Sequence, residues 1–450
     1  MGMKRKFLLC SIIIVFCIFA GCAPQSGKPE DTEQPLELYQ VDEAVVAPEW
    51  EDSFLAAPKE EGDLRIIQIS DPHYFSMSIT DQGILYQNAM AKAAGRDARH
   101  IGEILDAFYE QMQEEKPDVL IVSGDLSMNG EKASHIDFSN YLQKFEDIGI
   151  PVLVIPGNHD INSTSAREIY DSGAIPAENV TPEKFVEIYQ DFGYKDATYR
   201  DAETLSYVAD IGSNCWVIML DASIYKDGSI KASGYLSKDT RQWAYDIVEE
   251  ARQKGIRVFT VTHQNLLVHN ENFVSNYTIT DGASMVEKLM DEGVVINLSG
   301  HMHSMNIADR RELFYEVAMG SISVWPNLYG QLDIREDGTY SFTTHATEHE
   351  GNSYAYMLES TRQTLGNRMP QFDLQSEQLT IMRDFIVEMN VDYFAGKTKT
   401  LEEYESEAGY QLWQEYGKGT MNLDYINSIA HQKRNDHTFI APFRLTKPCS

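Results

Sequence analysis

Five short polar motifs, each placed where an apolar strand-like segment ends, constrain this chain more than any other feature. In chain order they are Asp71-Pro-His73, Gly124-Asp125, Gly157-Asn-His-Asp160, Thr262-His263 and Gly300-His-Met-His303. Because open α/β sheets place ligand sites beyond the carboxyl ends of their strands, we expect these side chains to meet at one end of a sheet. The motifs supply Asp, His and Asn groups, which are suited to holding two metal ions.

Strand and helix patterns alternate through the part of the chain that carries the motifs. Strands are predicted at 64–70, 118–123, 151–155, 205–209, 215–220, 256–261, 294–298, 313–318, 331–334 and 340–344. Helices are predicted near 100–113, 134–148, 182–191, 238–254 and 282–291. The alternation indicates a layered α/β fold, and the consecutive strands near 205–220 and 313–344 predict antiparallel edges in a mixed sheet or a two-sheet sandwich.

The pattern changes after about residue 350, where apolar residues recur at helical spacing and none of the five motifs falls. Helices are predicted around 379–393 and 404–416. We therefore expect a catalytic domain over 61–347 and a C-terminal helical region over 348–450. The favoured interpretation of this region is a subdomain that covers one edge of the sheet, and the alternative is a lid or partner-binding unit.

The N-terminus has the pattern of a lipoprotein signal peptide. Lys4–Lys6 forms a basic region, and Phe7–Ala20 is an apolar stretch of 14 residues, too short for a comfortable membrane span. Small residues then precede Cys22, as in a bacterial lipobox. We predict removal of residues 1–21, lipid attachment at Cys22 and an extracytoplasmic, membrane-anchored lipoprotein. An ordinary secreted protein and an uncleaved anchor are the alternatives.

Composition narrows the classes of partner and metal site. Residues 22–60 are rich in Pro, Glu, Gln and Asp and are predicted to form a flexible tether. A net charge of −32 argues against nucleic-acid polymers as partners, and it requires an anionic substrate to be attracted locally. Beyond Cys22 only Cys215 and Cys449 remain, so any metal must be bound by nitrogen and oxygen ligands.

The second and third motifs suggest distinct chemical roles. Asp125 follows an almost wholly apolar strand, where an unpaired carboxylate is costly, and its two oxygens can bridge two cations. Asn158 offers a neutral carbonyl oxygen to an ion. His159 can point at a substrate and, when protonated, donate to a leaving oxygen, while Asp160 can hold that imidazole in the required tautomer. Each motif alone also fits a cap or polar turn; their joint order favours the functional interpretation.

Taken together, the motifs resemble the calcineurin-like metallophosphoesterase family over about residues 64–345. The resemblance implies a mixed β-sandwich flanked by helices, to which this chain adds a C-terminal helical subdomain. It implies one metal on Asp71, His73, Asp125 and His303, a second on Asp125, Asn158, His263 and His301, and a catalytic His159 assisted by Asp160. The two ions would be divalent or trivalent Mn, Fe or Zn, among which such ligands do not choose. Residues 75–99 lie outside the resemblance.

The residues of the motifs resemble the cyclic-nucleotide phosphodiesterase branch of this family more closely than they resemble protein phosphatases. The implied activity is hydrolysis of a small-molecule phosphate ester by a metal-bridging hydroxide, with a phosphodiester favoured. The alternative enzyme is a phosphomonoesterase or nucleotidase. A lipoprotein that captures a phosphorylated ligand without turnover is a further alternative, which His159 and Asp160 disfavour because binding alone needs neither. Nearness to the motifs suggests Tyr74, Asn129, Asn265 and residues 325–329 as pocket walls.

Overall fold

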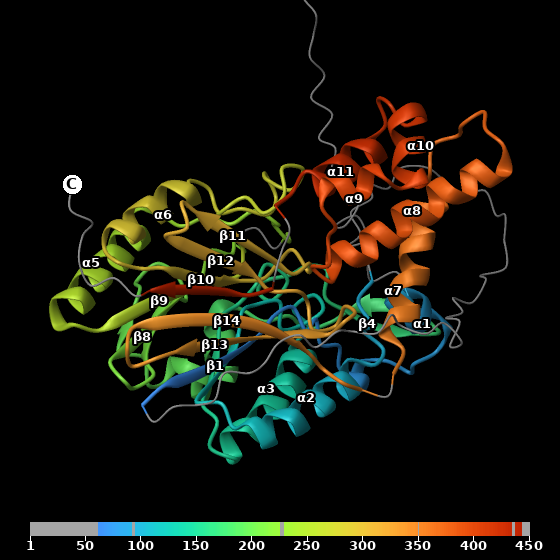
Figure 1. Ribbon diagram of the computed structural model, residues 1–450. Coiled ribbons are helices and arrows are strands. Elements are labelled where there is room, and N and C mark those ends of the chain that lie inside the picture. The colour runs from blue at the N-terminus through green and yellow to red at the C-terminus, as the bar shows by residue number, and fades with distance from the viewer. Residues whose placement is uncertain (1–61, 92–94, 226–228, 350, 434–436, 443–450) are drawn as a thin grey trace, which may run out of the picture.

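Two β-sheets packed face to face form the body of the protein, with helices on both outer faces and a helical unit at one end (Figure 1). The computed structural model describes residues 62–91, 95–225, 229–349, 351–433 and 437–442. The predicted signal peptide, Cys22 and the tether lie outside the described residues. Within the part of the chain that is described, no helix has the length and apolar character of a transmembrane span.

The first sheet has six strands in the order β15-β14-β13-β1-β2-β3. Three of them run parallel and end in the first three motifs: β1 (Leu64–Ile69), β2 (Val119–Val122) and β3 (Val152–Val154). The other three are antiparallel neighbours: β13 (Leu328–Ile334), β14 (Thr339–Ala346) and β15 (Phe439–Pro442). All four residues of β2 are buried, as expected of a central parallel strand covered on both faces.

The second sheet has seven strands in the order β11-β12-β10-β9-β8-β7-β6. Its parallel centre comprises β8 (Cys215–Leu220), β9 (Arg257–Thr262), β10 (Ile296–Ser299) and β12 (Phe314–Ala318). Antiparallel strands form its edges: β6 (Tyr199–Arg200), β7 (Tyr207–Asp210) and β11 (Asn306–Arg310). A separate hairpin joins β4 (Arg167–Tyr170) and β5 (Gly173–Pro176). The predicted mixed β-sandwich is therefore confirmed.

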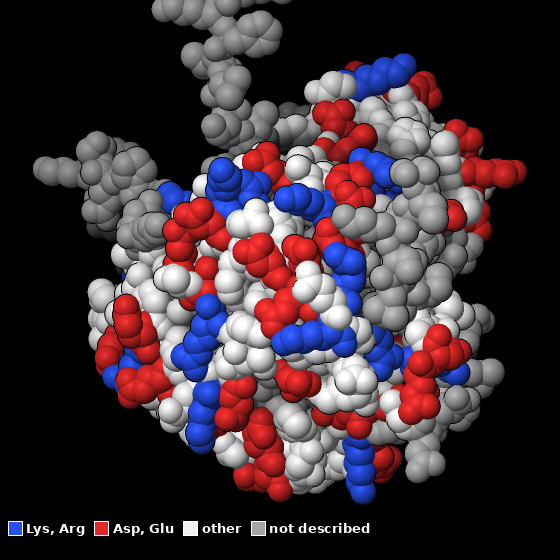
Figure 2. Space-filling model, turned by 90° about the vertical axis from the view of Figure 1, so that its left-hand side faces the viewer, with Lys and Arg blue, Asp and Glu red and all other residues white. Residues whose placement is uncertain are grey.

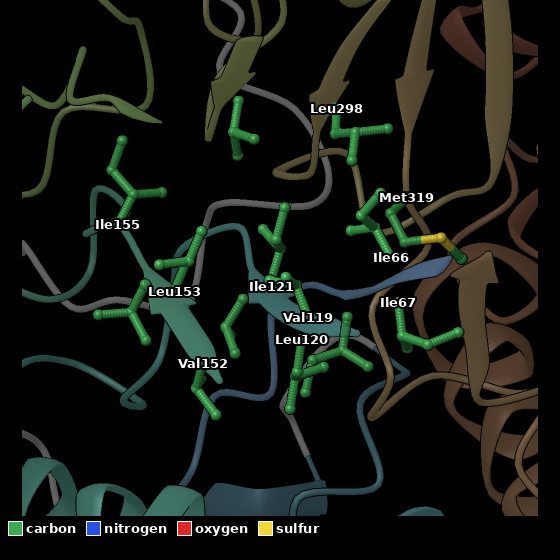
Figure 3. Close-up of a cluster of buried hydrophobic side chains, with 14 of the residues drawn as sticks. Ile66, Ile67, Val119, Leu120, Ile121, Val152, Leu153, Ile155, Leu298 and Met319 are labelled. Atoms are coloured by element: carbon green, nitrogen blue, oxygen red, sulfur yellow. The ribbon is translucent and has the colours of Figure 1, made fainter. Parts of the chain in front are cut away.

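The main hydrophobic core fills the space between the two sheets. Ile121 and Leu153 of the first sheet point toward Leu298 of the second, whereas Leu120 and Val152 point to the opposite face (Figure 3). This alternation follows from the two-residue period of a strand. The opposite face is covered by α2 (Ile101–Glu115) and α3 (Lys132–Asp147), and the second sheet is covered by α5 (Lys238–Lys254) and α6 (Gly282–Asp291).

The bounds predicted for α5 agree with the structure because both of its ends carry strong local signals. Ser237 caps the N-terminus by accepting a hydrogen bond from the backbone N–H of Thr240. Gly255 ends the helix in the left-handed conformation. The remaining elements of the sheet-bearing part are η1 (Met77–Ile79), α1 (Ile84–Ala91), α4 (Pro182–Ile188) and η2 (Gln190–Tyr194).

The C-terminal region forms a helical unit with its own core. It comprises α7 (Ser353–Thr361), η3 (Arg362–Gly366), α8 (Ser376–Phe394), α9 (Leu401–Glu405), α10 (Ala408–Tyr416) and α11 (Met421–Ala430). The fully buried Trp413 packs there and donates through its indole N–H to the carbonyl of Met382, at 2.8 Å. Two departures from the sequence prediction stand out. The helix predicted at 404–416 is divided between α9 and α10, and the chain returns to the first sheet as β15.

The surface is acidic without being uniformly so. Figure 2 shows one face, on which Asp and Glu side chains are spread widely with Lys and Arg side chains between them. Such a surface offers an anionic substrate no general attraction, given the net charge of −32. Attraction of a phosphate ester must therefore come from charges close to the site itself.

Candidate metal centre

The five motifs meet where the parallel strands of the two sheets end. Loops after β1, β2 and β3 supply residues from the first sheet, and loops after β9 and β10 supply them from the second. Two clusters form, in each of which the potential ligand atoms lie within 4.8 Å of one another: Asp71, His73, Asp125 and His303 in one, and Asp125, His263 and His301 in the other. Asp125 belongs to both clusters, which is the arrangement that a bridging carboxylate requires.

One oxygen of each carboxylate faces imidazole nitrogens. Oδ1 of Asp71 lies 3.2 Å from Nε2 of His303 and 3.7 Å from Nε2 of His73. Oδ2 of Asp125 lies 3.3 Å from Nε2 of His263 and 3.6 Å from Nε2 of His73. Oxygen and nitrogen atoms gathered in this way are the donors that Mn, Fe and Zn accept.

The other oxygen of each carboxylate is fixed by hydrogen bonds. Oδ2 of Asp71 accepts from Oγ of Ser70 at 2.5 Å and from the backbone N–H of His301 at 3.0 Å. Oδ1 of Asp125 accepts from the backbone N–H of His159 at 2.8 Å. The loop of the fifth motif thus orients Asp71, and the loop of the third motif orients Asp125. These contacts hold the two carboxylates in place without an ion.

Hydrogen bonds also set the tautomers of two imidazoles. Nδ1 of His263 lies 2.8 Å from the carbonyl oxygen of Ser123, and Nε2 of His301 lies 3.0 Å from the carbonyl oxygen of Asn276. A carbonyl only accepts, so in each ring the nitrogen that contacts it carries a proton. In the neutral rings, Nε2 of His263 and Nδ1 of His301 are then left with lone pairs for a cation.

Several polar atoms of the cluster are buried without a hydrogen-bond partner among the described residues. Oδ1 of Asn158 is one, and the others are Oδ1 of Asp71, Oδ2 of Asp125 and Nε2 of His263, whose imidazole–carboxylate contacts are ion pairs without hydrogen-bond geometry. Each such atom costs about 1–3 kcal/mol when nothing satisfies it. Bound cations would satisfy all of them, so the residues present suit two metal ions. The individual ligand assignments, including Asn158, stay predictions.

The backbone of the cluster is strained. Asp71, His73, Asp125, His301 and His303 all have positive φ values, between 46° and 69°. Each left-handed residue of this kind costs on the order of 1–3 kcal/mol, and such strain gathers at functional sites. Gly124 also has a positive φ, of 100°, and a Cβ there would collide with the ring of His263. Close approach of the loops therefore requires glycine at this position.

Charges within the cluster shift its pKa values strongly. Burial opposes ionisation of Asp125, but neighbouring His263 and His159 hold the pKa of its carboxyl well below the usual range. Burial likewise lowers the pKa of His263, yet Asp125 and Asp71 outweigh it and raise that pKa to about 10. For His301, burial and the charge of His263 lower the pKa to about 4. A cation that takes Nε2 of His263 must therefore displace a proton.

The ring of His159 is oriented differently from the sequence prediction. Its Nδ1 lies 3.0 Å from the carbonyl oxygen of Met128 and 3.1 Å from Oδ1 of Asn129. The predicted partner, Asp160, instead accepts hydrogen bonds from the backbone N–H groups of Leu126, Ser127 and Gly157. The prediction that Asp160 holds the imidazole was wrong, because this carboxylate satisfies the backbone of two motif loops. Asn129 is a common turn residue, so its sequence context carried no signal for this role.

Arg96 is a residue near the centre that the sequence analysis missed. Its backbone forms an isolated antiparallel bridge with Val324, and the N–H of Asp97 donates to the carbonyl of Ser323 at 2.6 Å. Ser323 and its neighbour Ser321 in turn donate through their hydroxyls to the carbonyl of Asp71. The positive charge of Arg96 contributes to lowering the pKa of both His73 and His159, after burial. Arg96 lies in the stretch 75–99, for which no motif existed.

Two of the predicted pocket walls prove to support the fold instead. Asn265 is fully buried and donates to Oγ of Ser299 at 2.8 Å and to the carbonyl of Gly300 at 3.3 Å. The ring of Tyr74 packs against Phe138, with 5.9 Å between centroids. Asn265 therefore stabilises the loop of the fifth motif, and Tyr74 belongs to the packing around α3.

A two-sheet sandwich with two clusters of potential metal ligands at its strand ends is typical of a metal-dependent hydrolase. Residues 64–305, more than half of the chain, match the family model for the calcineurin-like phosphoesterases. The chain belongs to this family and is a metal-dependent phosphoesterase that acts on phosphate esters. Residues 347–436 match a second model, the C-terminal domain of cyclic nucleotide phosphodiesterase.

Several solved structures are similar to this chain at low identity, with TM-scores below 0.5. A dimetal phosphatase from Danio rerio is 12% identical, with a TM-score of 0.46, over 64% of this chain and 97% of that one. A purple acid phosphatase from yellow lupin is 13% identical, with a TM-score of 0.41, over 65% and 52%. The NAD nucleotidase of Haemophilus influenzae is 10% identical, with a TM-score of 0.35, over 72% and 60%. A search of curated proteins gave no match.

Metal binding is expected to release protons. Between pH 6 and 8, roughly, His263 with its pKa of about 10 is protonated before binding, so about one proton should leave as an ion takes Nε2. Affinity for Mn²⁺ should therefore fall as pH falls. Calorimetric titration in two buffers of different ionisation enthalpy measures the released protons directly. Titrations that show no proton release would contradict the role given to His263.

Proposed function

We propose that this protein is a phosphodiesterase that hydrolyses a small-molecule phosphodiester at a dinuclear metal centre. The carrying observation is the sharing of Asp125 between two adjacent clusters of potential metal ligands. Two ions held by these residues would supply Lewis acidity and an activated water-derived nucleophile near neutral pH. The match of residues 347–436 to the C-terminal domain of cyclic nucleotide phosphodiesterase supports a diester over a monoester.

In the proposed mechanism His159 assists the leaving group. Its Nε2 lies 4.0 Å from Oδ2 of Asp125, so the ring lies at the edge of the two clusters of potential metal ligands. Nδ1 is anchored on Met128 and Asn129, so Nε2 is the atom presented to a substrate oxygen. Burial lowers the pKa of His159, although Asp125 opposes this. Protonation at Nε2 is thus favoured at lower pH or beside an anionic phosphate, and the acid role should weaken as pH rises.

Arg96 is proposed to bind a non-bridging oxygen of the phosphate. Its charge lowers the pKa of both His73 and His159, so it lies near both of these rings. A guanidinium suits this task because its planar fork matches phosphate oxygens. In a chain of net charge −32, such a local cation would offset the general repulsion of an anionic ester.

The anchor at Cys22 and the extracytoplasmic location are also proposed, on the pattern of residues 1–22 alone. Mass spectrometry of membrane-extracted protein would test the anchor. A Cys22 that carries no lipid and is still joined to residue 21 would contradict the proposed lipid anchor. The proposed domain bounds are a separate matter and remain 61–347 for the catalytic part and 348–450 for the C-terminal region, with β15 as a strand inside the latter.

The activity is tested with a chromogenic phosphodiester and the matching monoester. We expect turnover of the diester with added Mn²⁺, its loss with a chelator, and its loss in Asp125→Asn, which replaces the shared carboxylate by a neutral amide with a single oxygen. Faster hydrolysis of the monoester would select the phosphomonoesterase alternative. Metal-loaded protein that hydrolyses neither ester would contradict the phosphodiesterase and support the ligand-capturing alternative.

Replacement of His159 by Ala should slow turnover by roughly 10²–10⁴-fold, because a group that donates a proton to the leaving oxygen is removed. Metal content should stay near that of the wild type, since only the backbone of His159 contacts Asp125 within hydrogen-bond distance. Elemental analysis and kcat measured on the same preparation provide the check. Loss of both metals in this variant would assign His159 to metal binding instead.

Replacement of Arg96 by Gln should raise KM and weaken competitive inhibition by inorganic phosphate, each by about 10-fold or more, as expected for a lost charged hydrogen bond. Arg99→Gln is the matched control, because Arg99 lies over the ring of Tyr356, 5.2 Å from its centroid. The control should leave phosphate inhibition unchanged. Equal effects of both substitutions would indicate a general charge effect and argue against a contact with phosphate.

A further inference from the structure

We infer that the C-terminal helical unit positions the metal-site residue His301 by holding the loop at residues 270–277. This inference rests on the proposed function, because it concerns the second of its two cation sites. The helical unit would then support a metal-site residue, a role that differs from covering one edge of the sheet and from acting as a lid. The path runs through a short series of contacts from α8 and α11 to the ring of His301.

The first contacts of the path join the loop to His301. Nε2 of His301 lies 3.0 Å from the carbonyl oxygen of Asn276, and the ring of Tyr277 lies against the same imidazole, 5.3 Å between centroids. The carbonyl fixes the proton on Nε2, and the aromatic ring limits rotation of the imidazole. Both effects direct Nδ1 of His301 toward Asp125. The position of the loop therefore decides whether this ring can serve as a ligand.

The next contacts join the loop to the helical unit. The side-chain amide of Asn272 donates to the carbonyl of Asp424 in α11, at 3.0 Å. The ring of Phe273 lies 6.0 Å from that of Tyr425 in α11 and 6.5 Å from that of Tyr393 in α8. Phe273 also packs against Tyr277, 5.1 Å between centroids. The aromatic side chains thus form a continuous series from the helical core to His301.

The catalytic part holds mainly the two ends of this loop. Backbone N–H of Asn265 donates to the carbonyl of Tyr277 at 3.0 Å, which fixes the C-terminal end. Near the N-terminal end, Nδ1 of His269 lies 2.8 Å from Oδ1 of Asn306 in β11 of the catalytic part. The carbonyl of His269 also accepts from Nε2 of Gln432, which follows α11 in the C-terminal region, at 2.8 Å. Residues 274–276 between them are exposed to solvent. An exposed tip with few buried contacts opens readily unless a neighbour braces it.

The helical unit is itself fixed beside the fifth motif. The carbonyl of Phe394, at the end of α8, accepts from the backbone N–H of Met305, two residues after His303, at 3.1 Å. Nε2 of His437 lies 2.9 Å from the carbonyl of Gly396, and its Nδ1 lies 2.8 Å from Oγ1 of Thr344 in β14. A brace anchored to the catalytic sheet can transmit position to the loop.

The test uses the full-length protein with Asn272→Ala and Tyr425→Ala and Mn²⁺ as the probe. Loss of an outer partner of a metal-binding His weakens metal affinity by about 10–100-fold. We expect this loss at one site only, with the coupled dinuclear Mn²⁺ spectrum replaced by a mononuclear one in electron paramagnetic resonance. Without added metal, hydrogen exchange should be faster over residues 270–277.

Two controls match these substitutions. Ser275→Ala changes an exposed residue of the same loop, and Tyr416→Ala removes a Tyr that is 39% exposed on α10. Both should retain two Mn²⁺ ions at wild-type affinity. Circular dichroism verifies folding, and if Tyr425→Ala does not fold, the exposed Asn272 decides the outcome.

Three outcomes would overturn the inference: two ions bound at wild-type affinity in Asn272→Ala, equal weakening of both sites, or unchanged exchange in the loop. Failure of the proposed function is distinguishable. If only the activity is wrong, the metal-loaded wild type hydrolyses neither ester, whereas an Asp125→Asn variant that binds two Mn²⁺ ions as the wild type does would contradict the site. In that case the dinuclear site itself would be wrong, whatever the loop variants show.

Discussion

The buried carboxylate of Asp125 is the interaction on which the rest of the structure depends. It stands at the end of an entirely buried strand, in contact with imidazoles from both sheets. A carboxylate in such surroundings is tolerated only when cations or protonated neighbours compensate its charge. The carboxylate of Asp125 links the ends of β2 and β9, so the two sheets and the two clusters of potential metal ligands are electrostatically coupled.

The fold makes this unit possible by accepting local strain. Left-handed residues follow β1, β2 and β10, and they turn the side chains back toward the strand ends rather than outward to solvent. Hydrophobic packing between the sheets stabilises the strands whose ends carry the motifs, since Ile121 and Leu153 of the first sheet meet Leu298 of the second. The rigid strands therefore hold the loops in place, and the strained loops orient the side chains of the site.

The sequence predicted well those features that are encoded locally. Apolar runs with clear ends predicted the strands, and the helix predicted at 238–254 has local signals at both ends, the cap at Ser237 and the left-handed Gly255. The polar residues at strand ends were expected to converge, and Asp71, His73, Asp125, His263, His301 and His303 do lie together. Features that depend on tertiary contacts escaped prediction. The partners of Asp160, the proximity of Arg96 and the Asn276–His301 contact each join segments with no shared local pattern.

The return of the chain as β15 alters how the C-terminal region should be regarded. Because β14 precedes the helices and β15 follows them in the same sheet, the helical unit is an insertion between two adjacent strands. An insertion tied down at both ends cannot swing like an appended domain on a linker. Cutting the chain near residue 350 would also strip away an edge strand and bare the hydrogen-bonding groups of β14, a surface prone to self-association.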